Sequence, residues 1–195
     1  MTTTIRRWVE TDTGHRVPNH SSKCAHLHGH RYRFEAEISG ELVGDPEAPD
    51  DGMVLDFSDV SRILTEEIHD VVDHAFLIQD TDAAGRAACA AMGPNHRTVI
   101  LPFPPTAEHL AAWAYARVAK ALHESYGDRL RLEALHVPGN AEVLGDVPSL
   151  IFVLPGWKPA ATMLRPGLIA GHALQGGGRI QIRPKKPCHL VVRYG

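Results

Sequence analysis

The stretch "CAHLHGHRYRF", residues 24–34, places a cysteine and three histidines directly before an aromatic run. Successive side chains of a β-strand point to opposite faces, so His28 and His30 share one face, which continues through the apolar residues to Ile38. We therefore expect a strand over about residues 28–42 with two neighbouring imidazoles on its half-buried face. That geometry suits a metal ion or a proton-transfer site.

A catalytic zinc site needs three protein ligands and an open fourth position. His28 and His30 can supply two ligands, and His15 is the nearest third candidate, at the end of a first strand predicted from about Thr4. His26 is a rival for the third ligand, because it would share the strand face of His28 and His30. It lies beside the loop cysteine Cys24, however, where we expect the chain not yet to be extended. A lone histidine is more often hydrogen-bonded or exposed, whereas three on neighbouring strands favour a metal site; both interpretations stay open at this point.

Two further groups are candidates for proton transfer. Cys24 lies four residues before His28, and near a dication its thiolate form is favoured, as a nucleophile or a general base. Asp73 and His74 stand where a predicted helix ends. Because adjacent residues of a helix do not face each other, the residues alone favour a solvated helix end at this pair.

The bulk composition indicates an ordinary globular protein. The chain has 195 residues, 44% of them hydrophobic and 22% charged, with a formal net charge of -3. This balance argues against a nucleic-acid-binding surface. We expect no membrane span and no secretory signal, and the three irregularly spaced cysteines favour a reducing cytoplasm over a disulfide framework.

Periodicity in the remaining sequence alternates between the repeat of strands and the repeat of helices. From Ser58, apolar residues recur every three or four positions, which predicts a first helix that ends near "VVDHAFL" (71–77). A second helix is predicted from the N-cap Thr106 to Gly127. Between them, residues 80–97 are expected to form a loop with a short helical turn. The chain is thus predicted as an α+β protein with mostly antiparallel strands and helices on one face. Further strands are expected at residues 53–57, 98–103 and 129–137.

The C-terminal residues differ in composition from the rest. Residues 146–195 are rich in Gly and Pro around short possible strands. We therefore divide the chain into a main domain, 1–145, and an extension, 146–195, which could be an added β-hairpin or an oligomer contact.

Several motifs occur together in a recognisable order: "GHRVP", "KCAHLHGHRYRFEAEISGE", "GMVLDFSDV", "VVDHAFL" and "PPTAEHLAAW". In this order they resemble the 6-pyruvoyltetrahydropterin synthase superfamily, over roughly residues 5–137. The short C-x-x-x-H-G-H spacing is similar to the 6-carboxytetrahydropterin synthase branch. The resemblance implies a tunnelling fold, in which an antiparallel sheet carries two helices on one face and subunits close into an oligomeric barrel. Such proteins are commonly trimers or hexamers with active sites at subunit interfaces.

The same resemblance implies roles for individual residues. It makes His15, His28 and His30 the ligands of a Zn²⁺ ion. Cys24 becomes the catalytic base or nucleophile, and the relay is completed by Asp73 and His74.

The implied reaction is that of a zinc-dependent lyase. It converts 7,8-dihydroneopterin triphosphate to 6-carboxy-5,6,7,8-tetrahydropterin, with loss of acetaldehyde and triphosphate, in 7-deazaguanine (queuosine-type) biosynthesis. The expected partners are a small pterin substrate and further copies of the chain, without nucleic acid or membrane.

Substrate recognition departs from the family pattern. Thr106 and Glu108 match the family's P-T-x-E and are expected to line the pterin pocket, although Thr106 is equally explained as a helix cap. The family's pterin-binding glutamate is replaced by Gly139 or Asn140, and Glu142 is the candidate substitute. Two alternatives therefore remain: a paralogue acting on a different pterin, as a 6-pyruvoyltetrahydropterin synthase does, or a non-catalytic, zinc-stabilised oligomeric module.

Overall fold

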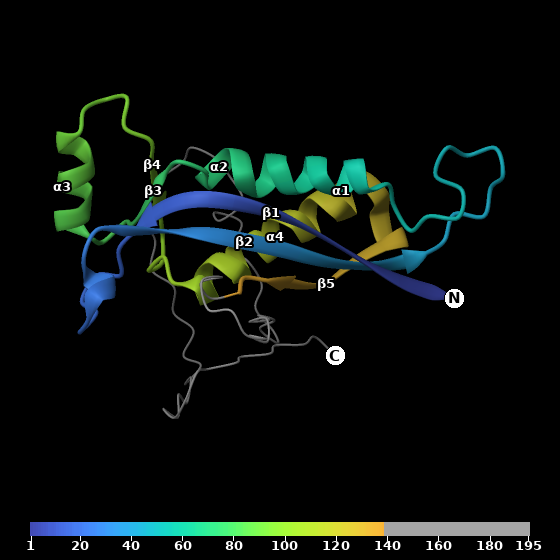
Figure 1. The fold of residues 1–195 in the computed structure, drawn as a ribbon, viewed down its shortest axis with the longest axis horizontal. Coiled ribbons are helices and arrows are strands. Elements are labelled where there is room, and N and C mark those ends of the chain that lie inside the picture. Colours follow the sequence, from blue (N-terminus) through green and yellow to red (C-terminus); the bar gives the residue numbers. More distant parts are fainter. Residues whose placement is uncertain (139–195) are drawn as a thin grey trace.

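A five-stranded sheet in the order β4-β3-β1-β2-β5 organises the computed structural model, which describes residues 1–138 (Figure 1). The two long strands β1 and β2 pair antiparallel along their whole length, and β5 pairs antiparallel with β2. The bounds of the strands are β1 Thr2–His15, β2 His28–Glu41, β3 Phe76–Gln79, β4 Thr98–Leu101 and β5 Leu130–His136.

The sheet is mixed, so the expectation of an antiparallel sheet is wrong for β3 and β4. Both strands run parallel to β1 and to each other. The helical segment after β2 travels along the direction of β1, and β3 enters the sheet at the end of β1 without reversing (Figure 1). A helix then separates β3 from β4, and a helical crossover is the connection that parallel neighbours require.

Two helical segments follow the predicted periodicity. The first comprises α1 (Phe57–Leu64), η2 (Thr65–His69, a π turn) and α2 (Asp70–Val72), and Asp56 caps it by accepting from the Ser58 N–H at 2.6 Å. The second, α4 (Ala107–Tyr126), begins after Thr106, whose hydroxyl accepts from the His109 N–H, and ends at Gly127 with φ of 60°. Two short 3-10 turns also occur: η1 (Lys23–Ala25) and η3 (Gly127–Arg129).

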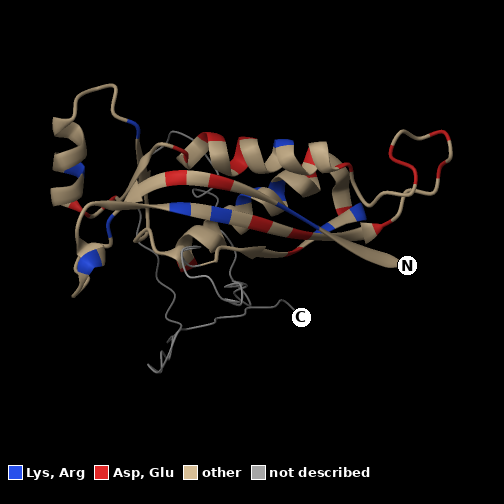
Figure 2. Ribbon diagram, in the orientation of Figure 1, with Lys and Arg blue, Asp and Glu red and all other residues tan. Residues whose placement is uncertain are grey.

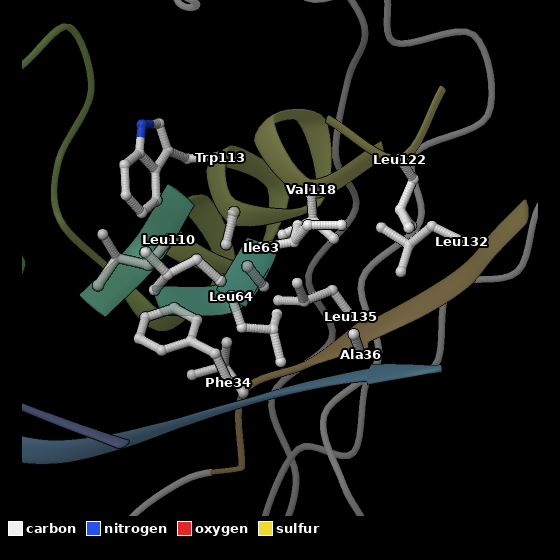
Figure 3. Packing of buried hydrophobic residues seen from close by; sticks show 14 of the residues in the cluster. Phe34, Ala36, Ile63, Leu64, Leu110, Trp113, Val118, Leu122, Leu132 and Leu135 are labelled. Atoms are coloured by element: carbon white, nitrogen blue, oxygen red, sulfur yellow. The ribbon is translucent and has the colours of Figure 1, made fainter. Parts of the chain in front are cut away.

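The core lies between one face of the sheet and these helices, as predicted. Phe34, Ala36 and Ile38 alternate along β2 with exposed fractions of 0–1%. Figure 3 shows this face packed against α1 and α4, with Leu64 and Leu110 above Phe34. Since each fully buried side chain of this size contributes about 1.5–3 kcal/mol, the cluster fixes which face of β2 points inward.

Two local predictions are wrong, and one strand was not predicted. Residues 53–57 form no strand, because Val54 and Leu55 turn into the core and Phe57 already begins α1. The first helix ends at Val72, within the predicted region, and Phe76 then begins a strand that the sequence did not predict. Residues 80–97 contain a nine-residue helix, α3 (Ala83–Ala91), because Asp82 caps it by accepting from the Gly85 N–H at 3.0 Å.

The face of the sheet away from the core carries mixed charge. Figure 2 shows Lys and Arg interspersed with Asp and Glu along β1 and β2. Arg6 pairs with Glu37 at 2.8 Å, and Arg33 pairs with Glu35 at 2.6 Å while its guanidinium lies 4.1 Å from the centre of the Trp8 ring.

Some predictions concern positions outside the described residues. The division at residue 145, the extension 146–195 and the candidate Glu142 all lie there. Within residues 1–138, no helix is long and apolar enough to cross a membrane.

Candidate metal centre

Three histidines converge at the end of the β1–β2 pair. The antiparallel register places His15 opposite His28, and His30 follows two residues along the same face of β2. The ring centres are 4.4 Å apart for His15–His28, 5.2 Å for His15–His30 and 4.9 Å for His28–His30. One nitrogen from each ring can be chosen so that all three lie within 4.8 Å of one another.

Backbone carbonyls determine which nitrogens face this centre. His15 Nδ1 is 2.7 Å from the carbonyl oxygen of Pro105, and His28 Nδ1 is 2.8 Å from that of His26. A carbonyl only accepts, so both Nδ1 atoms carry the hydrogen and both Nε2 atoms keep a free lone pair. His26, the rival ligand in the sequence, thus contributes its backbone oxygen, and its exposed side chain is not part of the cluster.

Burial keeps the most enclosed of these imidazoles neutral. Burial, opposed by the hydrogen bond to Pro105 and helped by the charges of His28 and His30, lowers the pKa of His15 to about 4. A neutral imidazole is the form that binds a metal ion.

The donor set fits zinc. Three neutral imidazole nitrogens with an open fourth position are typical of catalytic Zn²⁺, whose ligand nitrogens lie about 3.4 Å apart at Zn–N distances of about 2.1 Å. The three imidazole nitrogens lie within 4.8 Å of one another, so small side-chain rotations would bring them to the spacing of about 3.4 Å that zinc requires.

Cys24 and the beginning of α4 surround this centre. Burial raises the pKa of the Tyr32 phenol, and the charges of Cys24 and Glu108 raise it further, which places both side chains in the electrostatic environment of Tyr32. The Tyr32 hydroxyl in turn lies 3.2 Å from His15 Nε2. The Pro105 carbonyl that orients His15 immediately precedes the cap of α4. The structure therefore brings Cys24 and Glu108 to the same end of the sheet as the three histidines.

The Thr106 side chain acts as the N-cap of α4. Its hydroxyl accepts from the His109 N–H and lies 3.2 Å from His109 Nδ1. The His109 ring stacks on Phe103 with centres 5.2 Å apart, and burial lowers the pKa of His109 against the opposing charge of Glu108.

Asp73 and His74 do interact, contrary to the solvated helix end that the residues alone favoured. The helix ends at Val72, Asp73 is extended, and His74 has a φ of 54°, so the backbone is irregular where the two side chains meet. His74 Nδ1 is 2.7 Å from Asp73 Oδ2, and Asp73 Oδ1 accepts from the Asp12 N–H at 2.9 Å. Burial opposes the ionisation of Asp73, but these hydrogen bonds and the nearby imidazoles lower its pKa.

A second histidine, which the sequence analysis did not consider, also faces this carboxylate. His69 Nε2 is 3.5 Å from Asp73 Oδ2, and its Nδ1 is 3.1 Å from Asp70 Oδ1. The four-residue spacing between His69 and Asp73 was the available signal, since such residues share a helix face.

The Asp73–His74 pair lies beside β1, next to Asp12. Its contacts to β1 are the backbone N–H and carbonyl of Asp12. The side chain of Asp12 alternates with that of His15 and lies on the other face of the sheet, paired with Arg31 at 2.9 Å. The His74 side chain is 77% exposed.

Comparison with known proteins adds independent information. The model of the 6-pyruvoyl tetrahydropterin synthase family matches residues 4–142. A protein of Haemophilus influenzae named 6-carboxy-5,6,7,8-tetrahydropterin synthase is 36% identical over 115 residues, which are 58% of this chain and 80% of the relative. The protein of that name from Rickettsia bellii is 30% identical over 120 residues, covering 61% and 82%.

Solved structures share the fold at lower identity. An uncharacterized protein from Wolinella succinogenes has a TM-score of 0.56 at 18% identity, covering 73% of this chain and 96% of the other. The 6-pyruvoyltetrahydropterin synthase of Plasmodium vivax, in a variant form, has a TM-score of 0.55 at 14% identity, covering 73% and 94%. At these identities the likeness concerns the fold alone.

Proposed function

Since the chain belongs to the 6-pyruvoyl tetrahydropterin synthase family, we propose that it is a zinc-dependent carbon–carbon lyase acting on 7,8-dihydroneopterin triphosphate. With one water, the reaction yields 6-carboxy-5,6,7,8-tetrahydropterin, acetaldehyde and triphosphate. The relatives named for this product support the choice of reaction over the pyruvoyl-forming one.

The observation that carries the proposal is the convergence of His15, His28 and His30, with two of their tautomers set by backbone carbonyls. Zn²⁺ bound by these three nitrogens would supply a Lewis acid for the oxygen atoms of the substrate side chain. The chemistry of the donor set favours zinc over magnesium or calcium, which take oxygen ligands.

The other residues have proton-transfer and binding roles in this proposal. Cys24, as thiolate, takes a proton from one side-chain carbon of the substrate and returns it to the next. His74 supplies or collects a proton near neutral pH, held in position by Asp73. Glu108 and Thr106 border the pocket from the first turn of α4.

We further propose that active sites form between subunits of a homo-oligomeric barrel, a trimer or a hexamer. The support is the exposure of the His74 side chain, which leaves its imidazole accessible to another subunit. A second copy could present its own His74 to the metal centre of the first. Residues 1–145 would then be the catalytic domain, and 146–195 an extension outside it.

Subunit complementation tests this arrangement. Cys24→Ala and His74→Ala proteins, each inactive alone, are unfolded, mixed equally and refolded together. If the site is shared, about a quarter of the sites combine an intact Cys24 with an intact His74 from a neighbour, and activity returns to roughly that fraction. A mixture as inactive as its components would place both groups in one chain.

The biological setting follows from the product. We propose a cytoplasmic enzyme that serves 7-deazaguanine (queuosine-type) biosynthesis, because a 6-carboxylated tetrahydropterin is the carbon skeleton from which such a base is built.

Product analysis tests the reaction itself. The zinc-loaded full chain is incubated with 7,8-dihydroneopterin triphosphate, and the products are identified by mass spectrometry. We expect 6-carboxytetrahydropterin together with acetaldehyde. A pyruvoyl product would show a paralogue with different chemistry, and no turnover despite one zinc per chain would favour the non-catalytic module.

A further inference from the structure

Tyr32 is a buried polar side chain at the metal centre to which neither the sequence motifs nor the proposed mechanism assigns a role. It lies two residues after His30 on the same face of β2 and is 6% exposed. Its ring meets those of His15 and His30 edge to face, with centres 5.9 and 5.8 Å apart. It therefore forms the inner wall of the site, next to the core residue Phe34.

The hydroxyl of Tyr32 has a single acceptor among its contacts in the described chain. Its oxygen lies 3.2 Å from His15 Nε2 and 3.4 Å from His15 Nδ1. Nδ1 carries the hydrogen that it donates to the Pro105 carbonyl at 2.7 Å, so only Nε2 can accept from the phenol.

The same Nε2 is the atom of His15 that is available to a metal ion. One lone pair cannot both bind a metal ion and accept from a hydroxyl. Metal binding at His15 therefore deprives the phenol of its acceptor inside a buried site, and a buried donor without a partner is costly. An oxygen atom held at the open position of the same metal centre would provide a new acceptor.

We propose that the Tyr32 hydroxyl donates a hydrogen bond to the oxygen ligand that completes the His15–His28–His30 metal centre. This inference rests on the proposed metal site but not on the identity of the pterin. The phenol has one hydrogen to donate, so Tyr32 acts as a donor that selects oxygen ligands with lone pairs. During turnover that ligand would be a hydroxyl or carbonyl oxygen of the substrate side chain.

Acetate binding to the cobalt-substituted full chain tests the proposal without turnover. The wild type and Tyr32→Phe are loaded with Co²⁺, and acetate is titrated while the visible d–d absorption is followed. We expect the acetate Kd to rise about tenfold in Tyr32→Phe, the factor expected for one hydrogen bond to a charged group. The Co²⁺ affinity should stay within about threefold, because Phe keeps the ring contacts.

Tyr115→Phe is the matched control. The Tyr115 hydroxyl donates to the Leu132 carbonyl at 2.9 Å, between α4 and β5, so its loss should leave acetate binding unchanged. Equal acetate affinity in the wild type and Tyr32→Phe would overturn the proposal. A loss of Co²⁺ affinity matching the loss of acetate affinity would also overturn it, since Tyr32 would then only support His15.

Kinetics separates this inference from the proposed function. If the pterin is turned over, Tyr32→Phe should lower kcat at least tenfold at full zinc content, with a smaller change in KM. If the wild type turns over no pterin, the proposed reaction fails, while the acetate comparison still decides the role of Tyr32.

Discussion

Backbone carbonyls fix the tautomers of His15 and His28 in the candidate metal centre. Pro105, ninety residues away in sequence, holds the hydrogen of His15 on Nδ1, and the His26 carbonyl does the same for His28. These bonds fix both the ring orientation and the tautomer, so that the nitrogens facing the centre are ready to bind a cation. Pro105 and His26 thus influence the site through their backbone carbonyl oxygens and not through their side chains.

Cys24 is the residue whose replacement best separates binding from chemistry. In Cys24→Ala the three imidazole ligands remain, so zinc content should stay at one per chain. Turnover should fall by at least 10²–10⁴-fold, the usual contribution of a positioned acid–base group. Metal analysis and product formation are measured on the same sample.

Cys89→Ala is the control for that experiment. Cys89 is a buried cysteine in α3, outside the metal centre, and its replacement should leave kcat near the wild-type value. Wild-type turnover in Cys24→Ala would remove Cys24 from the mechanism.

At the scale of elements, an ion pair joins α3 to the strand that carries His15. Asp82, 6% exposed, caps α3 through Oδ1, and its Oδ2 lies 3.0 Å from Arg16 Nε in a close ion pair rather than an aligned hydrogen bond. Gly85 permits this approach, because a Cβ at that position would collide with the Asp82 carboxylate. Arg16, the residue after His15, thereby connects the end of β1 to the beginning of α3.

Asp82→Ala should therefore destabilise the protein. It removes the cap and leaves Arg16 without its carboxylate, and we expect a loss of about 2–3 kcal/mol in the free energy of unfolding. Thermal unfolding should show a Tm lower by roughly 5–10 °C.

Asp128→Ala provides the comparison, because the Asp128 side chain is fully exposed and contacts only His123, at 3.6 Å, in the described structure. It should change Tm by less than about 1 °C. Equal Tm values for the two variants would show that the Arg16–Asp82 tie contributes nothing to stability.

At the scale of the molecule, the charged face of the sheet makes stability depend on pH. His136 at the end of β5 is buried against Glu37, with Nε2 3.4 Å from its carboxylate. Burial lowers the pKa of His136 below its ordinary value of 6.5, although Glu35 and Glu37 oppose the shift. The unfolded chain therefore takes up this proton first as the pH falls, and the folded state loses stability below pH 6.5.

His136→Gln should flatten this dependence. In metal-free protein, the free energy of unfolding is measured by urea denaturation between pH 7.5 and 5.5, and the variant should show a slope smaller by up to one proton. Parallel curves for the wild type and His136→Gln would contradict the assignment.

Local sequence patterns determined the two long strands, the bounds of α4 and the family. Alternation predicted β1 and β2 and placed His28 beside His30, because side chains two apart share a strand face. The caps Thr106 and Gly127 predicted the bounds of α4, because they satisfy groups at the ends of that helix alone. The motif order gave the family, which the match over residues 4–142 confirms.

Tertiary structure decided what depends on long-range contacts. The direction of β3 and β4 follows from where helices return the chain, and α3 depends on a capping aspartate held by Arg16. The tautomer of His15 depends on Pro105, and the Asp73–His74 contact depends on a left-handed residue beside β1. Local periodicity reports which face a residue occupies, but not which distant backbone group it meets, because that partner is fixed only when the sheet and helices pack together.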